Sequence, residues 1–445
     1  MEQGPTRRRW LRSKWKIGIG ILLLLALPLL ALVAWDYLSQ RLADQELARL
    51  KASGSPVTIA ELEAFYALPP GADDVTRLWL SGSAGLATKT YVKSLPIVGD
   101  DDADIPPPGK PWADLKEAQR LLVKCQPELA LLHDAAARGG AARYPTNFKA
   151  GTAMLLVHIQ QLRSVARLLD LEARVKAHEG DAQGAAESIH ALFKLAGSLE
   201  HEPTLISQLV RIAIDGVGRQ TLEELLPHTA FGDGDLAFLQ ADLLATDYEA
   251  AMVRTLQSER ALSLEHFRDP GNLGSGVSSL TWRLTRGQDL RKFLSVMEQS
   301  IDIASQPAKA SRAAMDEFER SLTKANSSVV HRARYPLTSL IFDPHTTFAW
   351  NVRGTAASRI AATALAVQRH RRTHGALPKL LQDLSPELLS SIPTDPFDGQ
   401  PLRYAVRGAG FVVYSIGENG KDDGGKGDYH GKPDVVFTVK RGLEK

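Results

Sequence analysis

Residues 155–203 decide the fold class, and they read LLVHIQQLRSVARLLDLEARVKAHEGDAQGAAESIHALFKLAGSLEHEP. Steps of three and four residues separate the apolar positions of the first half, which is typical of one helix face: Leu155, Leu162, Val165, Leu169 and Ala173. Gly180-Asp181 fits a helix end followed by the N-cap of the next helix. A second apolar face follows, and Pro203 ends it. The stretch therefore predicts a helical hairpin.

A helix, a Gly-Asp turn, a second helix and a proline resemble a tetratricopeptide hairpin, whose repeat is about 34 residues long. Only one convincing copy is present, and stable solenoids usually need three or more. An ordinary helical hairpin therefore remains the alternative. Hydrophobic periodicity predicts further helices over 204–226, 235–267, 290–326 and 355–373. The chain is expected to be mainly α.

Composition excludes several classes of protein. The 445 residues are 44% hydrophobic and 23% charged, which are ordinary values for a globular protein with a sizeable core. Lys plus Arg number 53 against 51 Asp plus Glu, and this net charge of +2 argues against a dedicated nucleic-acid binder. The one cysteine, Cys125, excludes an internal disulfide and a cysteine-based metal cluster.

The N-terminal segment has the pattern of a membrane anchor. Six basic residues between Arg7 and Lys16 precede a stretch without charge, Ile17 to Trp35, which as a helix would be about 28 Å long. The positive-inside rule places the basic end in the cytoplasm and the bulk of the chain outside it. A cleaved signal peptide is the rival interpretation, although the small-residue cleavage pattern is poor. The expected location is the bacterial inner membrane, with a single span in the lipid bilayer.

Motifs for catalysis are missing from the sequence. No HExxH motif occurs, and Ser83 and Ser275 lack the GxSxG pattern of a nucleophile elbow. The sequence therefore predicts a protein that is not an enzyme and that uses no organic cofactor. The alternative is an enzyme whose active site is assembled from dispersed residues, around Asp343-Pro344-His345.

The C-terminal region differs in character from the rest. Short β-branched and aromatic runs predict strands over 402–406, 410–416 and 435–439, beside one long helix. Between them, residues 414–436 read YSIGENGKDDGGKGDYHGKPDVV. Hard cations such as Ca²⁺ prefer oxygen ligands, and glycines let a loop turn its carbonyls inward. The candidate oxygen donors are Asn419, Asp422, Asp423, Asp428 and Asp434. EF-hand spacing is absent, so an acidic loop without an ion remains the alternative.

The same region carries a family resemblance. The segments that carry it are Ile392-Pro393-Thr394-Asp395-Pro396-Phe397, Tyr414-Ser415-Ile416-Gly417 and Gly424-Gly425. They resemble the globular domain of the major pseudopilins of type II secretion systems, over about the last 90 residues. The resemblance implies that Asn419 and Asp434 are calcium ligands and that the Ile416 carbonyl contributes. The whole chain is similar to single-span bacterial membrane proteins that carry this tail on a helical body.

These observations predict three domains. Residues 1–35 form a basic segment and a transmembrane helix, 36–345 a helical extracytoplasmic body, and 346–445 a pseudopilin-like α+β domain. The predicted metal ligands are Ile416, Asn419, Asp422, Asp428 and Asp434. The expected function is a non-enzymatic, membrane-anchored envelope protein whose helical body binds a protein partner and whose tail is held together by calcium. A component or accessory of a type II secretion apparatus is the alternative, besides the enzyme.

Overall fold

The computed structural model describes residues 6–87, 95–98, 105–268, 282, 285–341, 345–427 and 434–440. Over these residues the protein is mainly helical and has one small antiparallel sheet near its C-terminus, as predicted. The contacts within the chain divide it into two compact units. Unit 1 comprises Met1–Leu62, Arg260–Gln299 and Glu319–Asp343, and unit 2 comprises Glu63–Glu259, Ser300–Phe318 and Pro344–Lys445. The three-domain division expected from the sequence stays a prediction.

Unit 2 contains the predicted hairpin. Helices α6 (Val157–His178) and α7 (Ala182–Gly197) pack against each other, and α8 (Leu205–Leu225) packs against both. Gly180 between them has a φ of +80°, which favours glycine, and the Asp181 carboxylate accepts a hydrogen bond from Gly184 N at 2.9 Å. The predicted helix end and N-cap are therefore confirmed. The likeness to a tetratricopeptide repeat stays a prediction.

Shorter helices complete this part of unit 2. Helices α3 (Thr76–Ala87), α4 (Leu115–Lys124) and α5 (Gln126–Arg138) pack around α6 and α7, and a 3₁₀ segment, η1, covers Phe148–Ala153. Their apolar faces meet in one core, where Leu132, Leu168 and Leu192 are wholly buried. Leu162, Val165 and Leu169 of the predicted face thus point into this core. The prediction is wrong for Leu155, which lies ahead of α6 and is 80% exposed. Cys125 is buried in this core too.

Two predicted helices are wrong in their extent, because each is broken in the middle. The region 235–267 forms α9 (Asp233–Ala245) and α10 (Tyr248–Arg268), since Thr246 is extended and the Asp247 carboxylate accepts a hydrogen bond from Ala250 N at 3.0 Å. The region 290–326 forms α12 (Arg286–Ala304) and α13 (Ala308–Asn326). Pro307 separates this second pair, because the residue before a proline disfavours the helical conformation.

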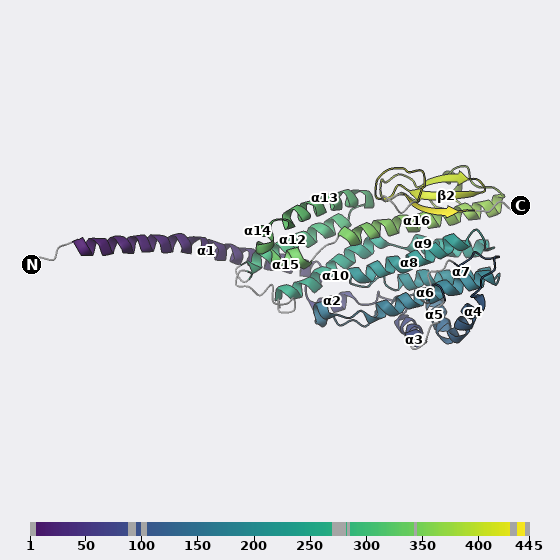
Figure 1. Ribbon diagram of the computed structural model, residues 1–445, viewed down its shortest axis with the longest axis horizontal. Helices are drawn as coiled ribbons and strands as arrows, with labels where there is room; N and C mark the ends of the chain where they lie inside the picture. Colours follow the sequence, from purple (N-terminus) through teal and green to yellow (C-terminus); the bar gives the residue numbers. More distant parts are fainter. Residues whose placement is uncertain are drawn as a thin grey trace, which may run out of the picture. The chain divides into compact units, whose positions relative to one another are not determined.

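The C-terminal module consists of a long helix and the sheet. Strands β1 (Arg403–Arg407), β2 (Gly410–Ser415) and β3 (Val435–Val439) pair antiparallel in the order β1-β2-β3, which confirms the three predicted strands. A 3₁₀ segment, η3, covers Leu381–Leu384. Helix α16 spans His345–His374, so it begins ahead of the predicted Thr355. Figure 1 shows α16 next to the sheet.

Burial explains the composition of α16. The helix packs against α8 and α9 as well as against β2 and β3, so it has core neighbours on opposite sides. Ile360, Leu365 and Val367 are wholly buried, and so are Ala361 and Ala364 between them. Alanines let neighbouring elements approach an α-helix closely without leaving voids. The helix therefore joins the sheet to the helical part of unit 2.

Unit 1 is built on the N-terminal helix. Helix α1 spans Thr6–Ala52, and two short helices, α14 (Val329–Arg334) and α15 (Pro336–Ile341), pack against each other. Helix α2 (Ile59–Phe65) begins in unit 1 and ends in unit 2. The core of unit 1 contains the aromatic pair Phe267 and Phe293, whose ring centroids lie 5.2 Å apart. The carboxylate of Asp289 accepts hydrogen bonds from the first turn of α15, from Leu337 N at 2.9 Å and Thr338 N at 3.1 Å. This carboxylate therefore satisfies N–H groups that an isolated helix end leaves without partners.

The described part of the chain contains no helix with the length and hydropathy needed to cross a membrane. Within the predicted span, the side chains at 17–21, 23 and 25 lie outside the described residues. Most of the apolar side chains that are described there are exposed, among them Leu24 at 73% and Leu27 at 62%. The membrane anchor stays a prediction.

Candidate binding site

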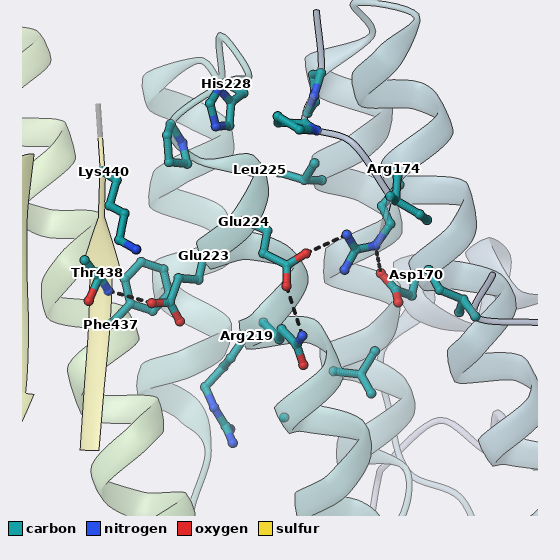
Figure 2. A pocket seen from close by; sticks show the side chains of 18 of the residues that line it. Asp170, Arg174, Arg219, Glu223, Glu224, Leu225, His228, Phe437, Thr438 and Lys440 are labelled. Atoms are coloured by element: carbon teal, nitrogen blue, oxygen red, sulfur yellow. Dashed lines mark hydrogen bonds and ion pairs between the residues drawn. The ribbon is translucent and has the colours of Figure 1, made fainter. Parts of the chain in front are cut away.

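A cavity of 1130 Å³, called here the site cavity, opens in unit 2 between α6, α8, the segment 105–108 and β3 (Figure 2). Its volume exceeds the roughly 300–1,000 Å³ of ordinary small-molecule pockets. Its walls carry both signs of charge, and the polar residues that matter below are Asp170, Arg174, His178, Glu223, Glu224, Thr438 and Lys440. Size and polarity favour a polar ligand larger than a typical metabolite.

Helix α8 supplies a carboxylate to each of two opposite walls. The helix begins at its N-cap Thr204, whose Oγ1 accepts a hydrogen bond from Ser207 N at 3.1 Å. Glu223 and Glu224 are consecutive, so their side chains leave the helix about 100° apart. Figure 2 shows Glu223 pointing toward β3 and Glu224 pointing toward Arg174 of α6. The position of these two groups therefore follows from the register of one helix.

The wall formed by α6 is held by a guanidinium between two carboxylates. Arg174 Nη1 donates to Glu224 Oε2 at 2.6 Å, and its Nε donates to Asp170 Oδ1 at 2.7 Å. Thr221 Oγ1 also donates to Asp170 Oδ1, at 2.7 Å. Burial opposes the charge of Arg174, but the two carboxylates outweigh it and raise the pKa of the guanidinium. This wall is therefore a fixed, charged structure.

The wall formed by β3 is held by a carboxyl group with a single backbone donor. Thr438 N donates to Glu223 Oε1 at 2.7 Å. Burial raises the pKa of Glu223 to about 7, and the charge of Glu224 acts in the same direction, whereas the Thr438 N–H and Lys440 act against it. Glu223 therefore changes its charge near neutral pH while it faces the cavity.

The edge of the sheet lies in the cavity wall. Val436, Phe437 and Thr438 all line the cavity, and β3 is an edge strand in the order β1-β2-β3. Because the Thr438 N–H is bound by Glu223, it points away from β2. Backbone groups alternate along an antiparallel strand, so the N–H and carbonyl of Val436 and the carbonyl of Thr438 point the same way. These groups can pair with another extended chain.

The imidazole of His178 is another polar group in the cavity wall. His178 Nδ1 is 2.9 Å from the carbonyl oxygen of Arg174, to which it donates. Its Nε2 is buried and has no hydrogen-bond partner among the described residues. Buried polar atoms normally have such partners, and those that do not require an explanation. A polar ligand in the site cavity that bonds to His178 Nε2 is one such explanation.

The predicted metal ligands lie in a different place, the loop between β2 and β3. Asp434, only 2% exposed, accepts hydrogen bonds from Gly425 N at 2.7 Å and from Asp423 N at 3.3 Å. Asn419 Oδ1 accepts from Lys421 N, and Asp422 Oδ1 accepts from Gly424 N, at 2.8 and 2.9 Å. Among the described residues, no group of three or more His, Cys, Asp or Glu side chains forms a metal site.

The structure therefore brings Asn419, Asp422 and Asp434 into one loop, where backbone N–H groups bind their oxygens. Ile416 lies at the start of this loop, and its N–H donates to Asp395 Oδ2 at 3.0 Å. Asp428 lies outside the described residues. These side-chain oxygens fit a loop held by hydrogen bonds better than a complete set of calcium ligands, and calcium binding stays a prediction. Asp343 and Pro344 of the dispersed-enzyme alternative also lie outside the described residues, as does the side chain of His345.

The residues of the site cavity were not among the predicted site residues. A signal was present in α6 and α8, because charged residues interrupt apolar faces at spacings of four, at Asp170 and Arg174 and again at Arg219 and Glu223. The contribution of β3 leaves no local signal, since Glu223 and Thr438 are 215 residues apart.

Comparisons of the chain with protein-family models, with curated proteins and with solved structures each found no match.

Proposed function

We propose that this chain is a non-enzymatic protein, anchored in the bacterial inner membrane by one helix, that holds an extended segment of a partner protein in the site cavity. The observation that carries the proposal is the edge of β3 in the cavity wall, with backbone groups directed into the cavity. An extended segment that adds to a sheet edge obtains affinity from main-chain hydrogen bonds and specificity from the pockets beside them.

The other walls suit the same kind of ligand. Lys440 offers positive charge, and Glu223 offers negative charge, so a segment with mixed polar side chains finds complementary groups. His178 Nε2 adds a buried polar atom that needs a partner. The cavity is also larger and more polar than sites for small apolar ligands usually are.

The anchor rests on a separate observation. Leu22, Leu27 and Leu30 on α1 are each more than 60% exposed, in a stretch that carries no charged residue. Exposed apolar side chains in such a row are unfavourable in water and favourable in lipid. Fusions of a reporter that is active only outside the cytoplasm, placed after Leu50, should be active. An inactive reporter together with an active cytoplasmic one contradicts this orientation.

Strand addition is tested with paired proline variants of the full chain in phosphatidylcholine nanodiscs. Peptides are selected from a random library on the wild-type protein and then measured against Val436→Pro. Proline removes an N–H directed into the cavity and leaves the β2–β3 hydrogen bonds in place, since proline is tolerated at sheet edges. We expect the variant to bind the selected peptides at least tenfold more weakly.

The matched control lies on the opposite edge of the same sheet. Val406 of β1 pairs with Phe411, and the alternation of the ladder directs its N–H away from β2 as well. Val406→Pro should therefore bind the peptides like the wild type. Peptides that bind Val436→Pro and the wild type equally would show that the β3 edge is not the docking strand. Circular dichroism spectra and melting curves of both variants establish that the sheet is folded.

A role as an accessory of a type II secretion apparatus is the second candidate. What favours it is the agreement between the module that the resemblance implies and the observed one, a long helix beside a three-stranded antiparallel sheet. In that case the selected peptides should match segments of pseudopilins, and synthetic pseudopilin segments should compete with them. Peptides without such a match leave the partner-binding proposal intact and argue against this candidate.

A further inference from the structure

A second cavity, of 440 Å³, lies between α8 and α16 and differs in character from the site cavity. Its walls are mostly apolar, and the residues that form them include Leu209, Ile212, Ala213, Gly216, Trp350 and Gly354. It shares Gly216, Arg219 and Ala357 with the site cavity, so the two are neighbours. We call it the α8–α16 pocket. Its volume is in the range of about 300–1,000 Å³ that small-molecule ligands occupy.

The pocket exists because of missing side chains. A Cβ at Gly216 would meet nothing nearer than Arg219 Nη2 at 3.7 Å, so this position leaves open space. A Cβ at Gly354 would come within 3.3 Å of Tyr248 Cε2, so glycine lets α16 approach closely at that point. At the pocket wall, the indole of Trp350 is 49% exposed. A large exposed aromatic ring beside an apolar cavity is typical of a ligand-binding site.

Two arginines belong to the pocket, and their partners differ. Arg219 forms an ion pair with Asp215, and its Nη1 donates to Ser358 Oγ at 3.2 Å. Arg353 is half-buried and has no hydrogen-bond or ion-pair partner among the described residues. Burial, together with the charge of Arg353, lowers the pKa of Arg219. Within the part of the chain that the structure describes, Arg353 is therefore a cation without a counter-charge, next to the guanidinium of Arg219.

We infer that the α8–α16 pocket binds a long-chain fatty acid, with its alkyl chain among the apolar residues and its carboxylate on Arg353. The apolar walls match an alkyl chain, and the guanidinium of Arg353, without a partner among the described residues, matches a carboxylate, which it can bind through two parallel hydrogen bonds. The anion also relieves the repulsion between the two arginines. This inference does not depend on the peptide site at β3.

The test uses the full chain in phosphatidylcholine nanodiscs and a palmitic acid that carries a photoreactive diazirine. After illumination, mass spectrometry of the digested protein locates the label. We expect labelled peptides from α8 and α16, and we expect unlabelled palmitate to compete. Arg353→Gln should weaken labelling about tenfold or more, the usual loss for a charge-assisted hydrogen bond. Ala213→Phe should also prevent it, since Ala213 lies in the pocket wall and its side chain is exposed, so the helix itself can accept the ring.

Arg372→Gln is the matched control, because Arg372 is an exposed arginine on the same helix, far from the pocket. It should label like the wild type, and melting curves of all three variants establish that they fold. Labelling that both Arg353→Gln and Ala213→Phe leave unchanged would overturn the inference. Competition by phosphatidylglycerol but not by palmitate would overturn it too, since the ligand would then be a phospholipid. No labelling of α8 or α16 in the wild type would have the same consequence.

Discussion

Two of the buried carboxylates in unit 2 organise different regions, Glu202 in the helical body and Asp395 in the C-terminal module. Glu202 is 1% exposed and Asp395 is wholly buried. A buried carboxylate is costly unless several donors bind it. Both meet this requirement, but they collect their donors in different ways.

Two of the three side-chain donors of Glu202 come from distant parts of the chain, and the third is nearby in α8. The Tyr66 hydroxyl donates to its Oε1 across 136 residues, His158 Nε2 lies 3.2 Å from its Oε2, and Ser207 Oγ donates to Oε2 at 2.8 Å. The Tyr66 hydroxyl itself accepts a hydrogen bond from Tyr144 N at 2.9 Å. The ring of Tyr144 stacks on His158 with centroids 4.7 Å apart. This cluster forms only when several helices have already packed.

The donors of Asp395 are all close in sequence. Its Oδ1 accepts from Phe397 N at 2.9 Å and from Ser415 Oγ at 2.8 Å, and its Oδ2 accepts from Ile416 N at 3.0 Å and from Arg403 Nη1 at 2.6 Å. No donor is more than 21 residues away. The comparison teaches that the module is specified by a local motif, whereas the body is specified by long-range packing.

The largest expected effect comes from Glu202→Ala. The variant leaves the donors of Tyr66, His158 and Ser207 buried without an acceptor, and the free energy of unfolding should fall by about 3–5 kcal/mol. Urea denaturation measures this change. Glu200→Ala is the control, because Glu200 has a side chain that is 41% exposed and its loss should cost about 0.5 kcal/mol. A loss below about 1 kcal/mol for Glu202→Ala would contradict the role of the cluster.

Asp395→Ala should have a somewhat smaller and more local effect, about 2–4 kcal/mol. Because its donors all lie within the module, hydrogen exchange should become faster in β1 and β2 and remain unchanged in α6 and α7. Asp398→Ala is the matched control, since Asp398 also pairs with Arg403 but its side chain is 23% exposed. Faster exchange throughout unit 2 would show that the module and the body are one cooperative structure.

This comparison also explains what the sequence could predict. The hairpin of α6 and α7 and the three strands depend on neighbours that are close in sequence, and the predictions for them are confirmed. The breaks at Thr246 and Pro307 were missed because apolar periodicity continues across them. The site cavity joins Arg174, Glu223 and Thr438, which meet only through tertiary packing. Hydrophobic periodicity in the sequence does not indicate which distant residues come into contact.

Glu223→Gln tests a third kind of buried carboxyl group, one with a single donor. Its pKa in the folded protein, about 7, lies above its ordinary value of 4.5, so the protonated form is favoured by folding. The wild type therefore loses more stability than the variant as the pH rises from about 4.5 to 7. At pH 8 the variant should be more stable by about 2–3 kcal/mol, and at pH 4 the two should be equal.

Two measurements control this prediction. Glu259, whose pKa is also raised to about 7 by burial, contributes the same pH dependence to both proteins, so the difference between them isolates Glu223. Glu224→Gln, one residue away, should have the opposite sign at pH 8, because it breaks the 2.6 Å ion pair with Arg174. A Glu223→Gln variant that is equally stable at every pH, or less stable at pH 8, would contradict the assignment.

The smallest expected effect is that of calcium on the loop between β2 and β3, and it bears on the module's local character. The hydrogen bonds of Asp434 with Gly425 N and Asp423 N hold the loop without an ion, so calcium should add to an already ordered segment. A cation near Asp422 and Asp434 also relieves the repulsion between them. At tenfold its dissociation constant, calcium should stabilise the protein by roughly 1.4 kcal/mol through mass action. Melting curves of the full chain measure the shift.

Asp422→Asn should abolish this shift, because the amide still accepts the Gly424 N–H but lacks the charge. Magnesium should not replace calcium, because it prefers smaller, more rigid sites. Identical curves with calcium and with chelator would mean that the local motif around Asp395 and the loop's own hydrogen bonds are enough to order the module.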